Sequence, residues 1–354
     1  MRYLLAIDSF KGCLSSSEAE RAVTEAISEM GHESVSIPMS DGGEGMLDAF
    51  LSAVHGTHQS VTVHDPLMRP VKAEYGLTTD GIAIIETARA CGLTLMSPSE
   101  RNPLIATSYG VGELIAHAVK QGCRRFIIGL GGSGTSDAGI GMLKALVDEL
   151  SPKGNIDYVR NGVMGHCSFT LACDVSNPLY GPNGAASVFG PQKGATDSMI
   201  SQIDRRALRF AQYSARHCGR DCSLQPGAGA AGGLGYAFMQ YFKASFQPGA
   251  DLLFSLTDFD HLLSVADCVI TGEGHADHQT LMGKLPHRIL LHAQAKDVPV
   301  WLIAGRADDT ISLLKAGFNR VESITPEGIP LKEALQPQVA IVNLQQTIRR
   351  MLLD

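Results

Sequence analysis

The stretch Gly129-Leu-Gly-Gly-Ser-Gly-Thr-Ser-Asp-Ala-Gly-Ile-Gly141 decides the fold. An apolar run at 125–130 leads into it and predicts a buried strand, and good helix formers at 142–147 follow it. Glycines at a strand-to-helix turn let a ligand approach the backbone, and the first helical N–H groups attract anions there. The stretch therefore predicts a turn that binds a phosphate or carboxylate, with Asp137 available for a metal ion. A turn that only packs the helix on the sheet is the alternative.

The same alternation of strand and helix returns at both ends of the chain. Apolar runs that predict buried strands, most of them before a helical pattern, occupy 3–7, 34–39, 169–173, 268–271 and 298–304. Short runs at 61–64, 71–75 and 82–86 instead predict an antiparallel meander. We therefore expect an α/β fold: a doubly wound parallel-sheet, Rossmann-like domain with a second, inserted α/β domain and the active site in the cleft between them. The expected boundaries are 1–56, 105–180 and 260–354 for the first domain and 57–104 and 181–259 for the second.

Composition narrows the class of protein. The chain has 354 residues, 44% hydrophobic and 18% charged, which is ordinary for an enzyme and wrong for a disordered protein. Its net charge of −7 argues against nucleic acid or an anionic membrane as partner, and no apolar run approaches a membrane span. The eight cysteines form no CxxC pair, and several lie inside apolar runs. They indicate reduced core residues and a cytoplasmic protein without a signal peptide.

Polar side chains follow nearly every predicted strand. They are Asp8 with Lys11, Asp41 with Glu44, Ser133 with Asp137, Asp174 with Asn177, and Glu273 with Asp277. Parallel strands present their carboxyl ends at one edge, and carboxylates that converge there repel each other unless a cation such as Mg²⁺ binds among them. Lys11, Lys193 and Lys284 lie in or next to glycine-bearing loops, where they can contact phosphate oxygens. Acids, lysines and glycine turns together are typical of phosphoryl transfer.

Parts of the sequence also match other classes of protein. Gly129-x-Gly131-x-x-Gly134 and Gly227-x-Gly229-x-x-Gly232 both match the dinucleotide fingerprint and keep a nicotinamide-dependent oxidoreductase acting on a small hydroxyacid as the alternative. Neither match has the surrounding strand–helix–strand unit with its following acid. A nucleotide-binding regulator without turnover is a third interpretation. The Walker spacing GxxxxGK[ST] is absent, which excludes a P-loop enzyme.

The pattern of motifs resembles the bacterial glycerate kinase family (glycerate kinase type 1, glycerate 2-kinase). The matching segments run in order along nearly the whole chain: 8–12, 38–45, 101–104, 107–112, 131–137, 173–178, 189–195, 226–235 and 270–284. Departures from the usual pattern also occur. The family usually has Ala at Gly134, Asn at Ser136, Gly at Ala138 and at Met68, and Arg at His275.

The resemblance implies an ATP- and Mg²⁺-dependent kinase that phosphorylates D-glycerate, usually to 2-phosphoglycerate. We hypothesise that Asp8 or Asp174 orients or deprotonates the attacking hydroxyl and that Lys11, Lys193 and Lys284 neutralise phosphate. The expected metal or substrate contacts are Asp41, Glu44 and Glu273. Arg101 and Asn102 are expected to grip the substrate carboxylate, and a role as a structural loop anchor stays open for them. Further substrate contacts are expected from Ser9, Ser108, Gly131, Gly132, Ser133 and Asp137. Whether the protein forms a homodimer stays open.

Overall fold

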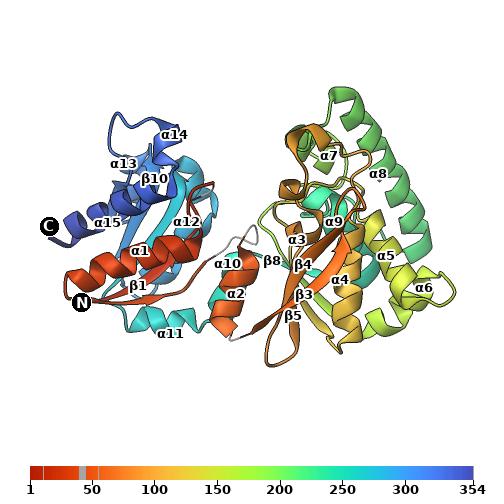
Figure 1. Ribbon diagram of the computed structural model, residues 1–354, viewed down its shortest axis with the longest axis horizontal. Coiled ribbons are helices and arrows are strands. Elements are labelled where there is room, and N and C mark those ends of the chain that lie inside the picture. Colours follow the sequence, from red (N-terminus) through yellow and green to blue (C-terminus); the bar gives the residue numbers. More distant parts are fainter. Residues whose placement is uncertain (11, 40–44, 55, 354) are drawn as a thin grey trace. The chain divides into compact units, whose positions relative to one another are not determined.

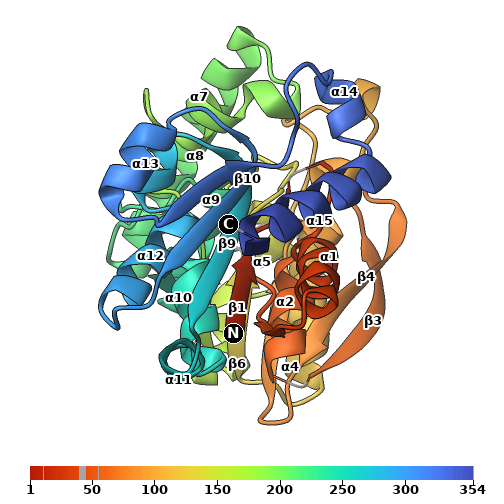
Figure 2. The same ribbon diagram turned by 90° about the vertical axis from the view of Figure 1, so that its left-hand side faces the viewer.

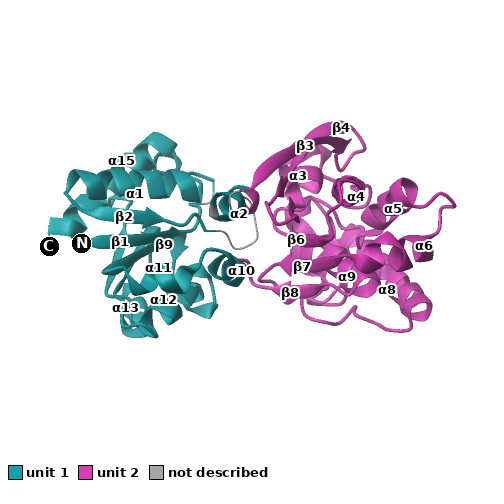
Figure 3. Ribbon diagram, turned by 90° about the horizontal axis from the view of Figure 1, so that it is seen from below, with its two compact units in different colours: residues 1–41, 48–54, 250–354 teal, residues 42–47, 55–249 magenta. Residues whose placement is uncertain are grey.

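The computed structural model describes residues 1–10, 12–39, 45–54 and 56–353. The chain divides into two compact units (Figures 1 and 3). Unit 1 comprises residues 1–41, 48–54 and 250–354, and unit 2 comprises residues 42–47 and 55–249. Among the described residues, no helix has both the length and the apolar character that a membrane crossing requires.

Unit 1 is built on a parallel sheet of five strands in the order β11-β10-β9-β1-β2. Its strands are β1 (Arg2–Ile7), β2 (Glu33–Ser36), β9 (Cys268–Ala276), β10 (Val300–Ala307) and β11 (Arg320–Ser323). Its helices are α1 (Ser16–Glu29), most of α2 (Met46–Val54), most of α10 (Gly249–Leu256), α11 (Phe259–Ser264), α12 (Leu285–Gln294), α13 (Thr310–Ala316), α14 (Leu331–Ala334) and α15 (Pro337–Leu353). Helices α1 and α15 cover one face and α12 and α13 the other (Figure 2). This is the doubly wound arrangement that the strand–helix alternation predicts.

A capping box opens α1. Ser15 accepts the amide of Glu18, and the Glu18 carboxylate accepts the amide of Ser15 at 2.9 Å. Ser16, directly after the cap residue, and Glu20, one turn later, form hydrogen bonds with strand β1. Strand β2 ends at Ser36, so the polar groups of Ile7 that face that side lack a strand partner. The Ser16 hydroxyl donates to the Ile7 carbonyl at 2.6 Å, and the Glu20 carboxyl accepts the Ile7 amide at 3.1 Å. Helix α1 thereby fixes the carboxyl end of β1.

Unit 2 carries a mixed sheet of six strands in the order β3-β4-β5-β6-β7-β8. Its strands are β3 (Thr57–His64), β4 (Pro70–Leu77), β5 (Ile82–Glu86), β6 (Arg125–Gly129), β7 (Ser168–Ala172) and β8 (Ser245–Gln247). Strands β3, β4 and β5 form the expected antiparallel meander, and β5 to β8 run parallel. Its helices are α3 (Ala88–Cys91), α4 (Tyr109–Lys120), α5 (Ile140–Leu150), α6 (Ile156–Asn161), α7 (Ala185–Phe189), α8 (Asp197–Cys218) and α9 (Ala230–Phe242). The larger of two apolar clusters found among the described residues of unit 2 joins the sheet to α4, α5 and α9.

The division into units differs from the expected boundaries. Residues 105–180 were expected with the first domain, but they belong to unit 2, because β6 pairs with β5 and β7 pairs with β6. Residues 250–259 belong to unit 1. The strand–helix rhythm shows that parallel strands exist, but it does not tell which sheet each strand joins. The fold class itself, α/β with parallel sheets, is confirmed.

Candidate active site

Three candidate segments of unit 2 lie at the carboxyl ends of neighbouring parallel strands and share one edge of the sheet. They are Glu86, the last residue of β5, the turn Gly131–Ser133 after β6, and Asp174 after β7. Asp174 is exposed. Glu86 was not expected as a site residue. Its side chain is 2% exposed, its Oε2 accepts the amide of Leu47 at 3.3 Å, and the Arg89 guanidinium lies 3.8 Å away. The signal that points to Glu86 is an acid that ends a buried strand.

The glycine turn is fixed to the segment after β5. The Gly132 carbonyl accepts the amide of Leu93 at 3.0 Å, and the amide of Gly134 donates to the Cys91 carbonyl at 2.7 Å. Gly132 has a φ of +73°, which an L side chain rarely adopts, and it is exposed. Within the described residues, no hydrogen-bond partner accepts the amides of Gly131 and Gly132. These two N–H groups can therefore bind an anion.

The glycine stretch leads from a strand to a helix, as the sequence predicts, but the turn Gly131–Ser133 is not itself the start of that helix. Helix α5 begins at Ile140, after an irregular segment, and Asp137 occupies the anion position at its start. The Asp137 carboxylate accepts the amides of Gly139, Gly141 and Ser108 and the Ser108 hydroxyl, at 2.9 to 3.1 Å. Because these donors occupy its oxygen atoms, the Asp137 carboxylate acts as a helix cap rather than as a metal ligand. Ser108, which is fully buried, contributes to the same cap.

Lys193, at the end of η4 (Pro191–Lys193), lies behind the glycine turn. Its side chain is 2% exposed, and its ammonium donates to the Thr135 carbonyl at 2.7 Å and to the Ser133 hydroxyl at 3.1 Å. Burial lowers the pKa of Lys193 from 10.5 to about 8, and charge interactions with Cys91 and Asp137 oppose this shift. The buried cation thus supports the turn from the interior of unit 2.

Arg101 and Asn102 lie in the loop that precedes α4. Arg101 lies against Gly194, where a Cβ would come within 2.7 Å of the Arg101 carbonyl oxygen. Its Nε is buried and has no hydrogen-bond partner among the described residues. Asn102 Oδ1 accepts the amide of Leu104 at 3.1 Å, which closes a local turn. The Asn102 side chain thus stabilises its own loop, and the roles of Arg101 and Asn102 toward a substrate stay predictions.

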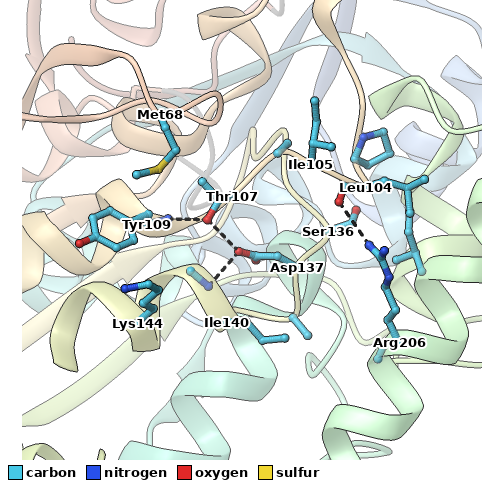
Figure 4. Close-up of a pocket in the computed structure, with 16 residues that line it drawn as sticks. Met68, Leu104, Ile105, Thr107, Tyr109, Ser136, Asp137, Ile140, Lys144 and Arg206 are labelled. Carbon is cyan, nitrogen blue, oxygen red and sulfur yellow. Dashed lines mark hydrogen bonds between the residues drawn. The ribbon is translucent and has the colours of Figure 1, made fainter. Parts of the chain in front are cut away.

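A cavity of about 540 Å³ opens beside these residues, wholly within unit 2. Figure 4 shows Thr107 and Asp137 joined by a hydrogen bond at its centre, with Tyr109 and Lys144 on one side and Arg206 on the other. The Arg206 guanidinium donates to the Leu104 carbonyl at 3.3 Å. Sequence reasoning had not singled out Lys144 or Arg206, because both lie within helices away from any strand end.

Unit 1 gathers a second set of candidates at the carboxyl edge of its own sheet. The amide of Asp8 donates to the Gly272 carbonyl at 2.9 Å, so Asp8 and Ser9 follow β1 beside β9. The Glu273 carboxylate, 6% exposed, accepts the Thr280 hydroxyl at 2.6 Å and the Lys284 ammonium at 2.9 Å. Lys284 itself is 41% exposed. Asp277 caps η5 (His278–Met282) and is occupied by that cap.

Three of the expected site residues, Lys11, Asp41 and Glu44, lie outside the described residues. In the part of the chain that the structure describes, no group of three or more His, Cys, Asp or Glu side chains is arranged to hold a metal ion. All eight cysteines are free thiols. The expected magnesium site therefore stays a prediction.

Comparison with known proteins defines the class. Residues 3–353 match the model of the Glycerate kinase family. Glycerate kinase of Bacillus subtilis (strain 168) is 39% identical over 95% of this chain and 93% of its own length. Glycerate 2-kinase of Escherichia coli (strain K12) is 36% identical over 95% and 93%. The crystal structure of putative glycerate kinase 2 from Salmonella typhimurium LT2 superimposes with a TM-score of 0.82 at 36% identity, covering 99% of this chain and 97% of that one. These matches make the protein a kinase. More narrowly, the chain belongs to the glycerate kinase family.

Proposed function

We propose that the protein transfers the terminal phosphate of ATP to D-glycerate, with Mg²⁺, and forms 2-phosphoglycerate. The observation that carries this proposal is the identity of 36% to 39% to glycerate kinases along nearly the whole chain. The relative from E. coli is named a glycerate 2-kinase, which favours the 2-hydroxyl as the acceptor.

The chain offers the groups that this reaction needs. The unpartnered amides of Gly131 and Gly132 suit an anionic oxygen of a phosphate or carboxylate. Asp174, exposed at the end of β7, suits the acid that accepts the proton of the attacking hydroxyl. We assign Lys193 to fixing the turn rather than to contacting phosphate, because its ammonium faces the interior. Arg101, with its unused Nε, suits the glycerate carboxylate.

Mg²⁺ prefers oxygen ligands, and the proposed ligands are carboxylates: Asp41, Glu44 and Glu273. The two hydrogen bonds that Glu273 accepts leave about two of its four lone-pair sites for a cation. When bound, Mg²⁺ would neutralise the charge on the transferred phosphate. Lys284 forms an ion pair with the buried Glu273 carboxylate, and its half-exposed side chain can also contact phosphate oxygens.

The oxidoreductase alternative loses its support in the structure. In the second fingerprint, Gly232 approaches the protein's own backbone, since a Cβ there would come within 1.9 Å of the Thr135 carbonyl oxygen. In the first, Gly134 lies against Gly92 and Met96. The glycines of both matches thus allow chain segments to pack closely, and no dinucleotide is needed to explain them.

The test is ADP formation from Mg-ATP with a panel of two- and three-carbon hydroxyacids, followed by phosphorus NMR of the product. We expect turnover with D-glycerate and a 2-phosphate resonance; L-glycerate and reactions without acid serve as controls. ADP release that no acid stimulates, or a hydroxyacid-dependent absorbance change with a nicotinamide cofactor, would contradict the proposal. A 3-phosphate product would contradict the assigned hydroxyl alone.

A further inference from the structure

Apolar side chains form much of the lining of the cavity in unit 2. The loop before α4 contributes Leu104 and Ile105, the start of α5 contributes Ile140, and α8 contributes Ile203. Ile105 is 64% exposed and Ile140 46% exposed, so both present apolar surface to whatever enters. Large apolar side chains left open around a hollow mark a binding site for a ligand that covers them.

Two of the three charged side chains that line the cavity, those of Asp137 and Lys144, are engaged with other groups of unit 2. Asp137, at its floor, accepts hydrogen bonds from Ser108, Gly139 and Gly141. Lys144 pairs with Asp148 and lies 5.8 Å from the centre of the Tyr109 ring. Beside Asp137 a small anion would meet a like charge, which disfavours a phosphate or free carboxylate in this position. On the other side of the cavity, Arg206 donates to the Leu104 carbonyl and has no acidic partner among the described residues.

The cavity also has a neutral residue with a hydroxyl group, Ser136, among its apolar side chains. Ser136 is one of the lining residues, and its hydroxyl oxygen is buried and has no hydrogen-bond partner among the described residues. A buried polar atom without a partner costs free energy unless a ligand or water satisfies it. The ligand that fits this cavity accordingly has flat apolar faces and a hydrogen-bonding edge.

Size separates the two substrates of the proposed reaction. Glycerate has three carbons and an oxygen on each, so it would leave most of the apolar lining uncovered in a cavity of about 540 Å³. A nucleoside has apolar ring faces and polar edges and fits the range of volumes that bind such ligands. Resting on the proposed function, we infer that this cavity binds the nucleoside part of the phosphoryl donor, with the base between Ile105 and Ile140 and its edge at Ser136.

The test changes the walls and leaves the candidate catalytic residues intact. Ile140→Trp fills the cavity from the start of α5, and Ile105→Glu makes its outer wall polar. Ile311, 68% exposed on α13 of unit 1, gives the matched controls Ile311→Trp and Ile311→Glu. Because these positions are exposed, the substitutions should leave the fold intact, and thermal unfolding of each variant checks this first. Calorimetry then gives the Kd for ADP and for adenosine, and kinetics give KM for ATP and for glycerate.

We expect both cavity variants to raise the Kd for ADP and adenosine and the KM for ATP by about tenfold or more, the usual size of such apolar contacts. The KM for glycerate should stay within about twofold, and the Ile311 variants should match the parent protein. A rise in the KM for glycerate instead, or ADP binding that neither variant changes, would overturn the inference. If the parent protein fails to phosphorylate glycerate, only the proposed function falls, because ADP binding by the same variants still decides what the cavity takes.

Discussion

Replacement of Lys193 by methionine gives the sharpest test of how the glycine turn is held. Lys193 is a buried cation whose ammonium contacts the Ser133 hydroxyl and the Thr135 carbonyl. Burial lowers its pKa from 10.5 to about 8. The folded protein therefore releases this proton at a lower pH than the unfolded chain does. Between these two pH values the unfolded chain binds more protons, so the free energy of unfolding rises with pH across that window.

The pKa difference sets the magnitude. A shift from 10.5 to about 8 corresponds to about 3 kcal/mol between the two protonation states. About 2 kcal/mol of this difference falls between about pH 7.5 and about pH 9.5. Methionine has a similar volume and no charge, so Lys193→Met should lack this pH-dependent part. The parent protein should gain about 2 kcal/mol relative to the variant over that range. Cys91, whose pKa burial raises to about 12, is present in both proteins and largely cancels in the difference.

The assay is urea unfolding of both proteins at several pH values, with Lys153→Met, at an exposed position, as the control. The control should follow the parent protein at every pH. If the parent and Lys193→Met differ by the same amount, within about 0.5 kcal/mol, from neutral to alkaline pH, then Lys193 is not a buried cation and our account of the turn is wrong. Under the proposed function, Lys193→Met should also raise the KM for ATP or glycerate, because Ser133 and Thr135 lose their shared donor.

Three other substitutions separate structural from chemical roles. Asp137→Ala should lower the free energy of unfolding by about 2 to 3 kcal/mol, because the amides at the starts of α4 and α5 lose their acceptor; a loss below about 0.5 kcal/mol in urea unfolding would contradict the cap. Asp174→Asn should leave stability within about 0.5 kcal/mol and lower turnover about 100-fold or more, whereas near-normal turnover would remove Asp174 from the chemistry. Ala138 has a φ of 56°, so Ala138→Gly should change stability little, since relief of about 1 kcal/mol of strain offsets the added chain entropy. Ala145→Gly, inside α5, should cost about 1 kcal/mol or more in the same unfolding experiment, and equal costs at both positions would refute the strain.

The sequence predicted the elements that depend on residues close together in the chain, such as a helix start and an antiparallel meander. The spacing Ser15-x-x-Glu18 is the sequence signature of the capping box that opens α1. The short alternating runs predicted the antiparallel β3–β5 meander. The order of strands did not follow from such short-range patterns, because β6 and β7 have the same apolar pattern whichever sheet they join. Their neighbours are chosen by packing over long sequence separations, and that choice placed residues 105–180 in unit 2.

The chemical state of a site residue depends on the same long-range packing. Asp137 and Asp174 look alike in the sequence, as acids a few residues after a buried strand. The structure surrounds Asp137 with backbone donors and leaves Asp174 exposed. Similarly, Lys193 and Lys284 both lie beside glycines, yet one is buried and the other is 41% exposed. Spacing identified the residue types of the reaction, and only burial and hydrogen bonding separate those that support a loop from those that face solvent.

In each unit, buried polar side chains form hydrogen bonds that fix a loop with candidate site residues. In unit 1, Ser16 and Glu20 replace a missing strand partner of Ile7, just before Asp8, and burial raises the pKa of Glu20 well above its ordinary value. In unit 2, the buried Lys193 ammonium donates to Ser133 and Thr135 and so fixes the turn that contains Gly131. Buried polar groups are seldom the most stabilising choice, since apolar residues of the same volume often give an equal or higher stability. Their presence directly behind two strand-end loops therefore argues that they serve the geometry of those loops. Substitutions at Ser16 and Glu20 should accordingly be judged by turnover and KM, with unfolding measured alongside to show that the fold survives.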